Sequence, residues 1–229
     1  MLMKNSTIIT VAALLAAGTA FANAETVSGT DTASGSGIST ITGFKVDLDA
    51  LNWTPDFSDE ITTFTLKSID FASTSGAHSN AKFYSGNLYA FIYEGEVAPN
   101  NVGSSTSSVA VSMNSISWNS NSSSNSGTWN FDNVALDLTK TYSVLFSSSQ
   151  DSFVSAKGSS GSGEGIRSTV TTTGASAILV ANYNGSAFLG SNGVNATLNG
   201  IVIPEPSAFG LLAGLGALAL AGTRRRRRK

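Results

Sequence analysis

Apolar residues in the middle of the chain recur at every second position over short stretches, and this spacing is typical of β-strands rather than helices. Ile61–Phe71 alternates apolar and polar residues, with one slip between Leu66 and Ile69. Val109–Met113 alternates in the same way, and Leu88–Tyr93 is continuously apolar or aromatic, as in a buried strand. These stretches predict β-strands.

Turn-forming residues and Ser/Gly/Asn clusters separate the apolar stretches, at 53–56, 85–87, 119–127 and 158–164. Further strands are predicted at 38–51, 82–94 (as a pair), 129–138, 142–146, 166–172, 177–183 and 194–203. About ten short strands at roughly 8–12-residue spacing predict an all-β fold, an antiparallel β-sandwich. The passage from Trp129 to Ser148 resembles the edge of a jelly-roll or galactose-binding-like β-sandwich. A parallel β-helix is the alternative, although no fixed-period repeat supports it.

The N-terminus has the organisation of a secretory signal peptide. Lys4 precedes an apolar stretch, which ends in Ala22-Asn23-Ala24. This pattern predicts a signal peptide over 1–24 that signal peptidase cleaves between Ala24 and Glu25. An uncleaved N-terminal anchor is the alternative. The small polar residues 25–37 are expected to form a flexible linker or a ragged first strand, ahead of an ectodomain over 38–203.

The C-terminus combines an apolar run with a block of cations. Ala208–Gly222 contains 15 uncharged residues and is roughly 22 Å long as a helix, which is short against a hydrocarbon core of about 30 Å. The chain ends in six consecutive cations, Arg224, Arg225, Arg226, Arg227, Arg228 and Lys229. Such a block stays in the cytoplasm and binds anionic headgroups. We therefore expect a short membrane-spanning helix over 208–222, with the preceding chain outside. A buried core helix and a nucleic-acid-binding Arg patch are the alternatives.

Pro204, Glu205 and Pro206 stand directly before the apolar stretch, in the sequence IPEPSAFGLLAGLGALALAGTRRRRRK. The prolines favour an extended, accessible segment with one carboxylate. This order, confined to about 203–229, resembles the PEP-CTERM sorting signal of Gram-negative bacteria. The resemblance implies that an exosortase, a membrane-embedded enzyme similar to a cysteine transpeptidase, removes the helix and tail of an inner-membrane intermediate. It also implies transfer of the upstream part to the cell surface or an exopolysaccharide matrix.

Composition limits the chemistry of the mature part. The whole chain has 13 basic and 15 acidic residues and no cysteine. Loss of Lys4, Glu205 and the six tail cations leaves six basic and 14 acidic residues, a net charge near −8. A chain this acidic binds nucleic acid poorly, and without cysteine it has neither disulfides nor thiol chemistry. Roughly 180 residues remain, which suits one domain.

The sequence contains no recognisable catalytic set, so no catalytic residue is assigned. His78 is the only histidine and lies in the predicted loop SGAHSN, where a solvated side chain is the simpler interpretation. No phosphate-binding loop, zinc-ligand spacing or dinucleotide fingerprint is present. We therefore expect a protein that is not an enzyme and that needs no cofactor.

Acidic residues before and after the predicted break at 53–56 suggest one metal site. Asp47 and Asp49 are two residues apart, so on a strand both would point to the same face. Asp56 and Asp59 follow in the next loop. These carboxylates could hold a structural calcium ion through oxygen ligands, although their spacing matches no defined calcium loop. Plain surface carboxylates are the alternative.

Aromatic side chains near predicted loops suggest a surface that stacks on sugar rings. Trp53 and Trp118 are the candidates, ahead of Trp129, which lies in a strand pattern. Buried aromatics that form a core are the alternative.

Three functions follow from these observations. The first is a non-enzymatic bacterial surface or extracellular-matrix protein, sorted through its C-terminus. The second is a carbohydrate-binding β-sandwich that attaches to exopolysaccharide or host glycan. The third is a secreted glycosidase or esterase, which would require two carboxylates about 5–10 Å apart in a cleft, or His78 beside a serine.

Overall fold

Antiparallel β-strands build the protein, as the alternation in the sequence predicts. The structure, a computed structural model, describes residues 24–31, 37–57, 61–73, 82–159, 163–171, 177–190 and 192–203. Within these residues the fold is all-β, with one short 3₁₀ helix, η1 (Pro99–Asn101). The strands are β1 (Glu25–Thr30), β2 (Gly37–Asp47), β3 (Asn52–Thr54), β4 (Thr63–Ser73), β5 (Gly86–Glu94), β6 (Ala110–Val111), β7 (Ile116–Trp118), β8 (Asn125–Asp137), β9 (Thr141–Ser147), β10 (Ile166–Thr171), β11 (Ile178–Asn182) and β12 (Gly193–Val202).

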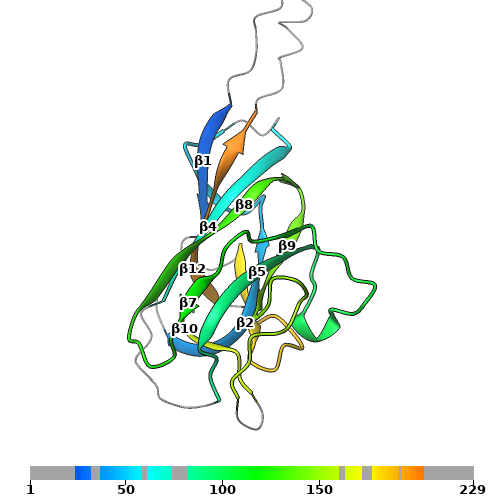
Figure 1. The fold of residues 1–229 in the computed structure, drawn as a ribbon. Coiled ribbons are helices and arrows are strands. Elements are labelled where there is room, and N and C mark those ends of the chain that lie inside the picture. The colour runs from blue at the N-terminus through cyan, green and yellow to red at the C-terminus, as the bar shows by residue number, and fades with distance from the viewer. Residues whose placement is uncertain are drawn as a thin grey trace, which may run out of the picture. The chain divides into compact units, whose positions relative to one another are not determined.

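The strands pair in one continuous, folded sheet with two parts (Figure 1). In the first part the order is β8-β4-β12-β1-β3, and in the second it is β6-β5-β9-β2, with β10 and β11 also paired to β2. Strand β12 joins the two parts, because its first residues pair with β10 and its remainder pairs with β4. The result is an antiparallel, sandwich-like arrangement.

Aromatic side chains from both parts of the sheet meet in the core. Phe71 of β4 contacts Phe44 of β2, with ring centroids 6.3 Å apart, and Phe146 of β9, at 5.4 Å. Trp129 of β8 stacks on the same Phe146 at 5.7 Å. Offset and edge-to-face contacts of this kind add to the free energy gained from burying apolar area. This aromatic cluster therefore holds the two parts of the sheet face to face.

A β-bulge explains the slip in the alternation of the fourth strand. Phe64, Leu66, Ile69 and Phe71 are all buried, although Ile69 follows Leu66 by three positions rather than two. The pairing of β4 with β12 shifts register here: Ser68 pairs with Asn199 and Leu66 pairs with the next residue, Gly200, so Lys67 is the extra residue of β4. The slip in the sequence is thus confirmed as a change of register within one strand.

Several predicted boundaries differ from the structure. Residues 25–30, expected as a linker or a ragged strand, form β1, because Val27 is buried in the core. The predicted strand pair at 82–94 is a single strand, β5. Strand β8 begins inside the predicted Ser/Asn loop and runs for 13 residues. Strand β3 occupies part of the predicted break at 53–56, and the short β7 was not predicted.

The first and last strands of the ectodomain are neighbours. Strand β1 pairs next to β12, and the Ser28 hydroxyl donates a hydrogen bond of 2.7 Å to the Asn199 side chain. In Figure 1 the blue β1 begins, and the orange β12 ends, at the same end of the sheet. Thr26–Val202 forms one compact unit, and the other unit, Met1–Glu25 with Ile203–Lys229, contains only three described residues: Ala24, Glu25 and Ile203.

None of the described residues belongs to a helix long and apolar enough to cross a membrane. The helix predicted at 208–222 lies outside the described residues.

Candidate functional site

The sorting and processing residues lie almost entirely outside the described part of the chain. Pro204, Glu205, Pro206 and the cationic tail 224–229 are not described, and neither is the signal peptide before Ala24. Ala24 is exposed and directly precedes β1, which starts at Glu25. At the other end Val202 is fully buried and Ile203 is exposed. The two predicted processing points therefore stand next to the ends of two neighbouring strands.

The tryptophans predicted to stack on sugars are packed against other side chains. Trp118 is 1% exposed and contacts Phe71, so it belongs to the core and offers no face to a ligand. This corrects its assignment as a sugar platform. Trp53 is half-buried between Phe57 and Phe64, and its indole N–H donates to the Leu48 carbonyl at 3.1 Å.

The Trp53 ring also restricts which residue can lie opposite it in β1. A Cβ on Gly29 would lie 2.8 Å from the Trp53 ring, so only glycine fits beneath the indole. The ring thus packs over Gly29 of β1, while Trp53 as a whole is half-buried.

The predicted calcium ligands do not converge within the described residues. No group of three or more His, Cys, Asp or Glu side chains comes together there. Asp47 ends β2, whereas Asp49 lies in the following turn, so the two do not share a strand face as predicted. The Asp56 carboxylate accepts a hydrogen bond from the Phe57 amide at 3.0 Å, and Asp59 lies outside the described residues. His78 lies outside them as well.

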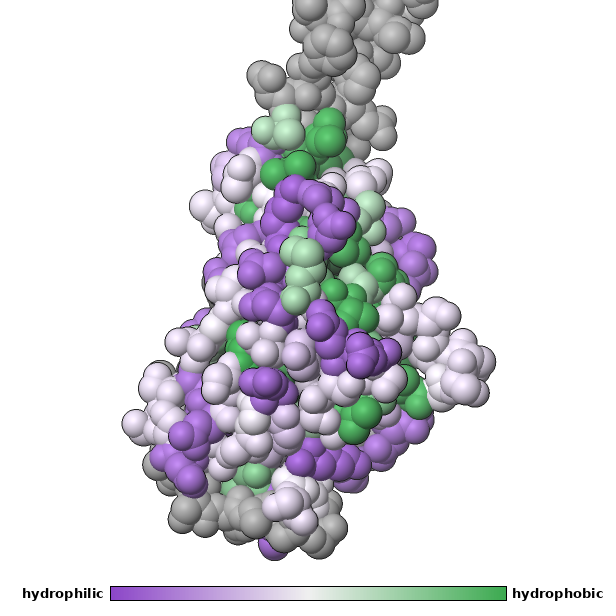
Figure 2. Space-filling model, viewed as in Figure 1, coloured by the Kyte–Doolittle hydropathy of each residue, from purple (hydrophilic) through white to green (hydrophobic). Residues whose placement is uncertain are grey.

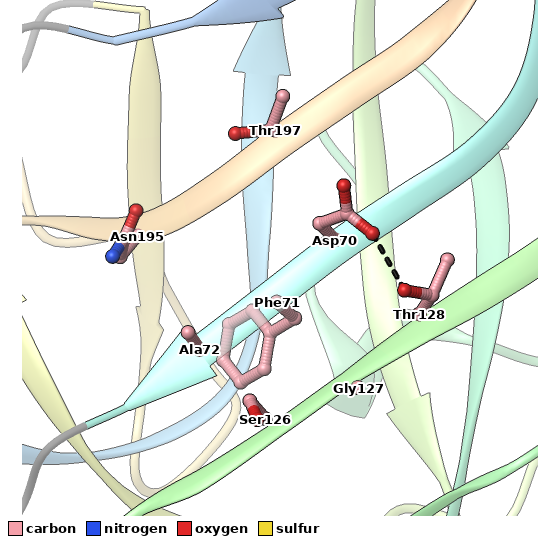
Figure 3. A pocket seen from close by; sticks show the side chains of 8 residues that line it. All are labelled: Asp70, Phe71, Ala72, Ser126, Gly127, Thr128, Asn195 and Thr197. Atoms are coloured by element: carbon pink, nitrogen blue, oxygen red, sulfur yellow. Dashed lines mark hydrogen bonds between the residues drawn. The ribbon is translucent and has the colours of Figure 1, made fainter.

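Small polar side chains cover the outer face of three neighbouring strands. The register places Ser126, Ala72 and Asn195 in one row, Thr128, Asp70 and Thr197 in the next, and Asn130, Ser68 and Asn199 in the third. A hollow of about 300 Å³ lies over the first two rows (Figure 3). This face has one charged residue, Asp70, and no exposed aromatic ring.

Hydrogen bonds link this polar face across four strands. Asp70 accepts from the Thr128 hydroxyl at 2.6 Å, drawn as a dashed line in Figure 3, and from the Asn199 amide at 2.8 Å. Asn199 in turn accepts from Ser28 of β1. Both carboxylate oxygens of Asp70 are therefore engaged in cross-strand bonds, which suits a structural part in the sheet.

A second hollow, of about 550 Å³, lies on the opposite part of the sheet. Phe91 and Tyr93 of β5 line it together with Phe153, and the remaining walls come from 102–108 and Ser152. Burial raises the pKa of the Tyr93 phenol above its ordinary value, so this hydroxyl stays protonated at neutral pH. The hollow combines aromatic rings with aliphatic hydroxyls, and none of the described residues that line it is charged.

The sequence contained one signal for this second hollow. Leu88–Tyr93 is apolar at every position, and the structure shows why: alternate residues face the main core, while Tyr89, Phe91 and Tyr93 face a smaller apolar cluster on the outside. An apolar outer face of a strand indicates that other segments of the chain cover it. The covering segments themselves, rich in serine and glycine, had no apolar periodicity that would reveal them.

The chain was compared with protein-family models, with curated proteins and with solved structures, and none of the three comparisons finds a match.

Proposed function

We propose that this chain is an exported bacterial surface or extracellular-matrix protein that is sorted and processed through its C-terminus. The observation that carries the proposal is the order Pro204-Glu205-Pro206, uncharged run 208–222 and cationic tail 224–229 at the end of a chain that begins like a secretory precursor. The tail holds the C-terminus in the cytoplasm while the ectodomain is outside. An exosortase then cleaves near the Pro-Glu-Pro segment.

The arrangement of the ectodomain supports this proposal. Strands β1 and β12 are neighbours, so signal-peptide cleavage and C-terminal processing take place at one end of the sandwich. The rest of the domain, with its loops, is then free to face outward. In finer detail, we propose a jelly-roll-like sandwich that serves for display rather than catalysis.

The carbohydrate-binding alternative is compatible with display, because a displayed domain can also attach to glycan. The glycosidase alternative requires two carboxylates facing each other in a cleft. Of the two hollows described above, one has a single carboxylate, Asp70, and the other has none. Neither hollow therefore supports that mechanism.

The test is the mass of the mature protein released from the cell surface, for wild type and for Glu205→Ala. We expect the wild type to start at Glu25 and to lack the apolar run and the cationic tail, and the variant to keep both and to stay in the membrane. Glu96→Ala is the matched control, because Glu96 is exposed and its ion pair with Lys45 is a surface pair that contributes little. A wild-type protein that retains Arg224–Lys229 would contradict the sorting proposal and leave export intact.

A further inference from the structure

The outer face of β5 is unusual because it is aromatic. Tyr89, Phe91 and Tyr93 point away from the main core, and Phe91, Tyr93 and Leu145 of β9 form a separate buried cluster. The corresponding outer face of β4 has Ser68, Asp70 and Ala72 instead. An aromatic outer face needs a cover, and here loops of the same chain provide it.

One ring of that cover remains partly open to solvent. Phe153 meets Phe91 edge-on, with centroids 5.8 Å apart and planes at 72°, and meets Tyr93 at 6.3 Å and 90°. These contacts fix the Phe153 ring over the cluster, while the ring itself is only half-buried. An aromatic ring is thus held in place at the edge of the 550 Å³ hollow, whose volume is within the range of small-ligand sites, about 300–1,000 Å³.

The rim of the hollow consists of hydroxyl groups: Ser104, Thr106, Ser107, Ser108 and Ser152 line it. The Thr106 hydroxyl accepts a hydrogen bond from the Gly103 amide at 3.2 Å. The four serine hydroxyls make no hydrogen bond with any other described residue, so they can donate to and accept from a ligand. In Figure 2 the loop that projects from the body beside this region is pale, neither strongly hydrophilic nor hydrophobic.

Charge restricts the ligand further. No charged residue is among the described residues that line the hollow. Of the neighbouring acidic residues, Glu94 and Glu96 form ion pairs with Lys140 and Lys45, and Asp151 directly precedes Ser152. The whole mature part has six basic and 14 acidic residues. This excess of acidic residues disfavours an anionic ligand, and a cationic one would find no carboxylate among the described residues of the hollow.

We propose that this hollow, between 102–108 and Phe153, binds a neutral saccharide. A sugar ring has an apolar C–H face that packs on an aromatic ring and an equatorial belt of hydroxyls. The Phe153 ring matches the first feature, and the serine hydroxyls match the second. The hollow around Asp70 is the weaker candidate, because Phe71 beneath it is buried and both Asp70 oxygens are bonded to neighbouring strands. The proposal rests on the proposed function in one respect: the protein must be exported to encounter the saccharide outside the cell.

The test is affinity electrophoresis of the mature protein, purified from cells that express the full chain, in native gels that contain dextran, mannan, galactan or laminarin. Alginate is the anionic comparison.

The variants are Phe153→Leu, which keeps apolar volume but removes the ring, and the double variant Ser104→Ala with Ser107→Ala. The controls are Phe57→Leu, which removes another half-buried ring, and Ser126→Ala in the hollow around Asp70. Thermal unfolding of every variant verifies the fold.

We expect at least one neutral polysaccharide to retard the wild type, and both hollow variants to bind it about tenfold more weakly, as when a single good contact is lost. The controls should bind within about twofold of wild type. Retardation by alginate alone, no retardation by any of the four neutral polysaccharides, or wild-type binding by folded Phe153→Leu would overturn the proposal. The gels measure binding and the mass measurement reports sorting, so either proposal can fail without the other.

Discussion

Two buried tryptophans of this domain differ in what their polar end meets. The Trp129 indole N–H donates a buried hydrogen bond of 2.8 Å to the Leu88 carbonyl, across from β8 to β5. The Trp118 indole N–H is buried without a hydrogen-bond partner among the described residues. Both rings belong to the same aromatic cluster and contact Phe71. The two residues therefore offer a natural comparison of ring packing with and without the hydrogen bond.

Replacement of each tryptophan by phenylalanine should separate these contributions. Both variants lose a similar volume, but only Trp129→Phe also removes a hydrogen bond and leaves the Leu88 carbonyl with one partner fewer. We expect the free energy of unfolding of Trp129→Phe to fall below that of Trp118→Phe by about 1–3 kcal/mol. Denaturant unfolding at pH 7 measures both values. Equal losses in the two variants would show that the indole bond to Leu88 contributes nothing.

The turn between β8 and β9 is the element that depends most clearly on pH. Hydrogen bonds from the Thr139 hydroxyl, at 2.7 Å, and from the Thr139 amide, at 2.9 Å, lower the pKa of the Asp137 carboxyl below its ordinary value. A carboxyl whose pKa is lowered by folding stabilises the folded state above its unfolded-state pKa. This contribution disappears as the pH falls through the folded-state pKa.

Asp137→Asn should therefore destabilise the protein at neutral pH and have a smaller effect in acid. We expect the difference in melting temperature between wild type and Asp137→Asn to narrow as the pH is lowered from 7 to about 2. Asp132→Asn, at another exposed carboxylate of β8, is the matched control. A difference that stays constant with pH would mean that the Thr139 bonds do not favour the charged form.

The strands could be predicted where one face alone is buried. In β4 the alternation, slip included, was visible in the sequence, because the outer face is polar and the inner face apolar. The limits of β5 and β8 could not be predicted, since they depend on partners distant in sequence: Gly86 starts β5 because it pairs with Trp118 of β7, and Asn125 starts β8 because it pairs with Ser73. Pairing of this kind leaves no local pattern.

The half-exposed aromatic ring could not be located from the sequence. An aromatic surface for sugar was expected at Trp53 and Trp118, because tryptophans near loops are common in such surfaces. The structure buries Trp118 in the core and leaves Phe153 half-exposed. The exposure of an aromatic ring depends on which loop covers it, and a single sequence does not contain that information.

For the molecule as a whole, the structure limits where the proposed C-terminal cleavage can take place. Val202 is fully buried and pairs with Phe64 of β4, in the interior of the sheet. Cleavage before Ile203 would cut into a packed strand, which an enzyme cannot reach without unfolding the edge of the domain. We expect the intact mass of the mature protein to place its C-terminus at Ile203 or later.

Isoelectric focusing of the same sample reports whether the tail is lost. Loss of the tail should change the net charge from −2 to near −8, which isoelectric focusing detects as a shift to a lower pI than 5.3. A C-terminus upstream of Val202 would show that processing precedes folding of β12.

The position of β12 also has a mechanical consequence. A protein attached through its C-terminus and drawn away from the cell is pulled along β12, which lies between β4 and β1. Eight residue pairs, from Asn195–Ala72 to Val202–Phe64, resist that pull in shear, so their bonds share the force instead of opening one after another. The rate of forced unfolding, rather than the equilibrium free energy, then determines how long the domain survives in flowing liquid.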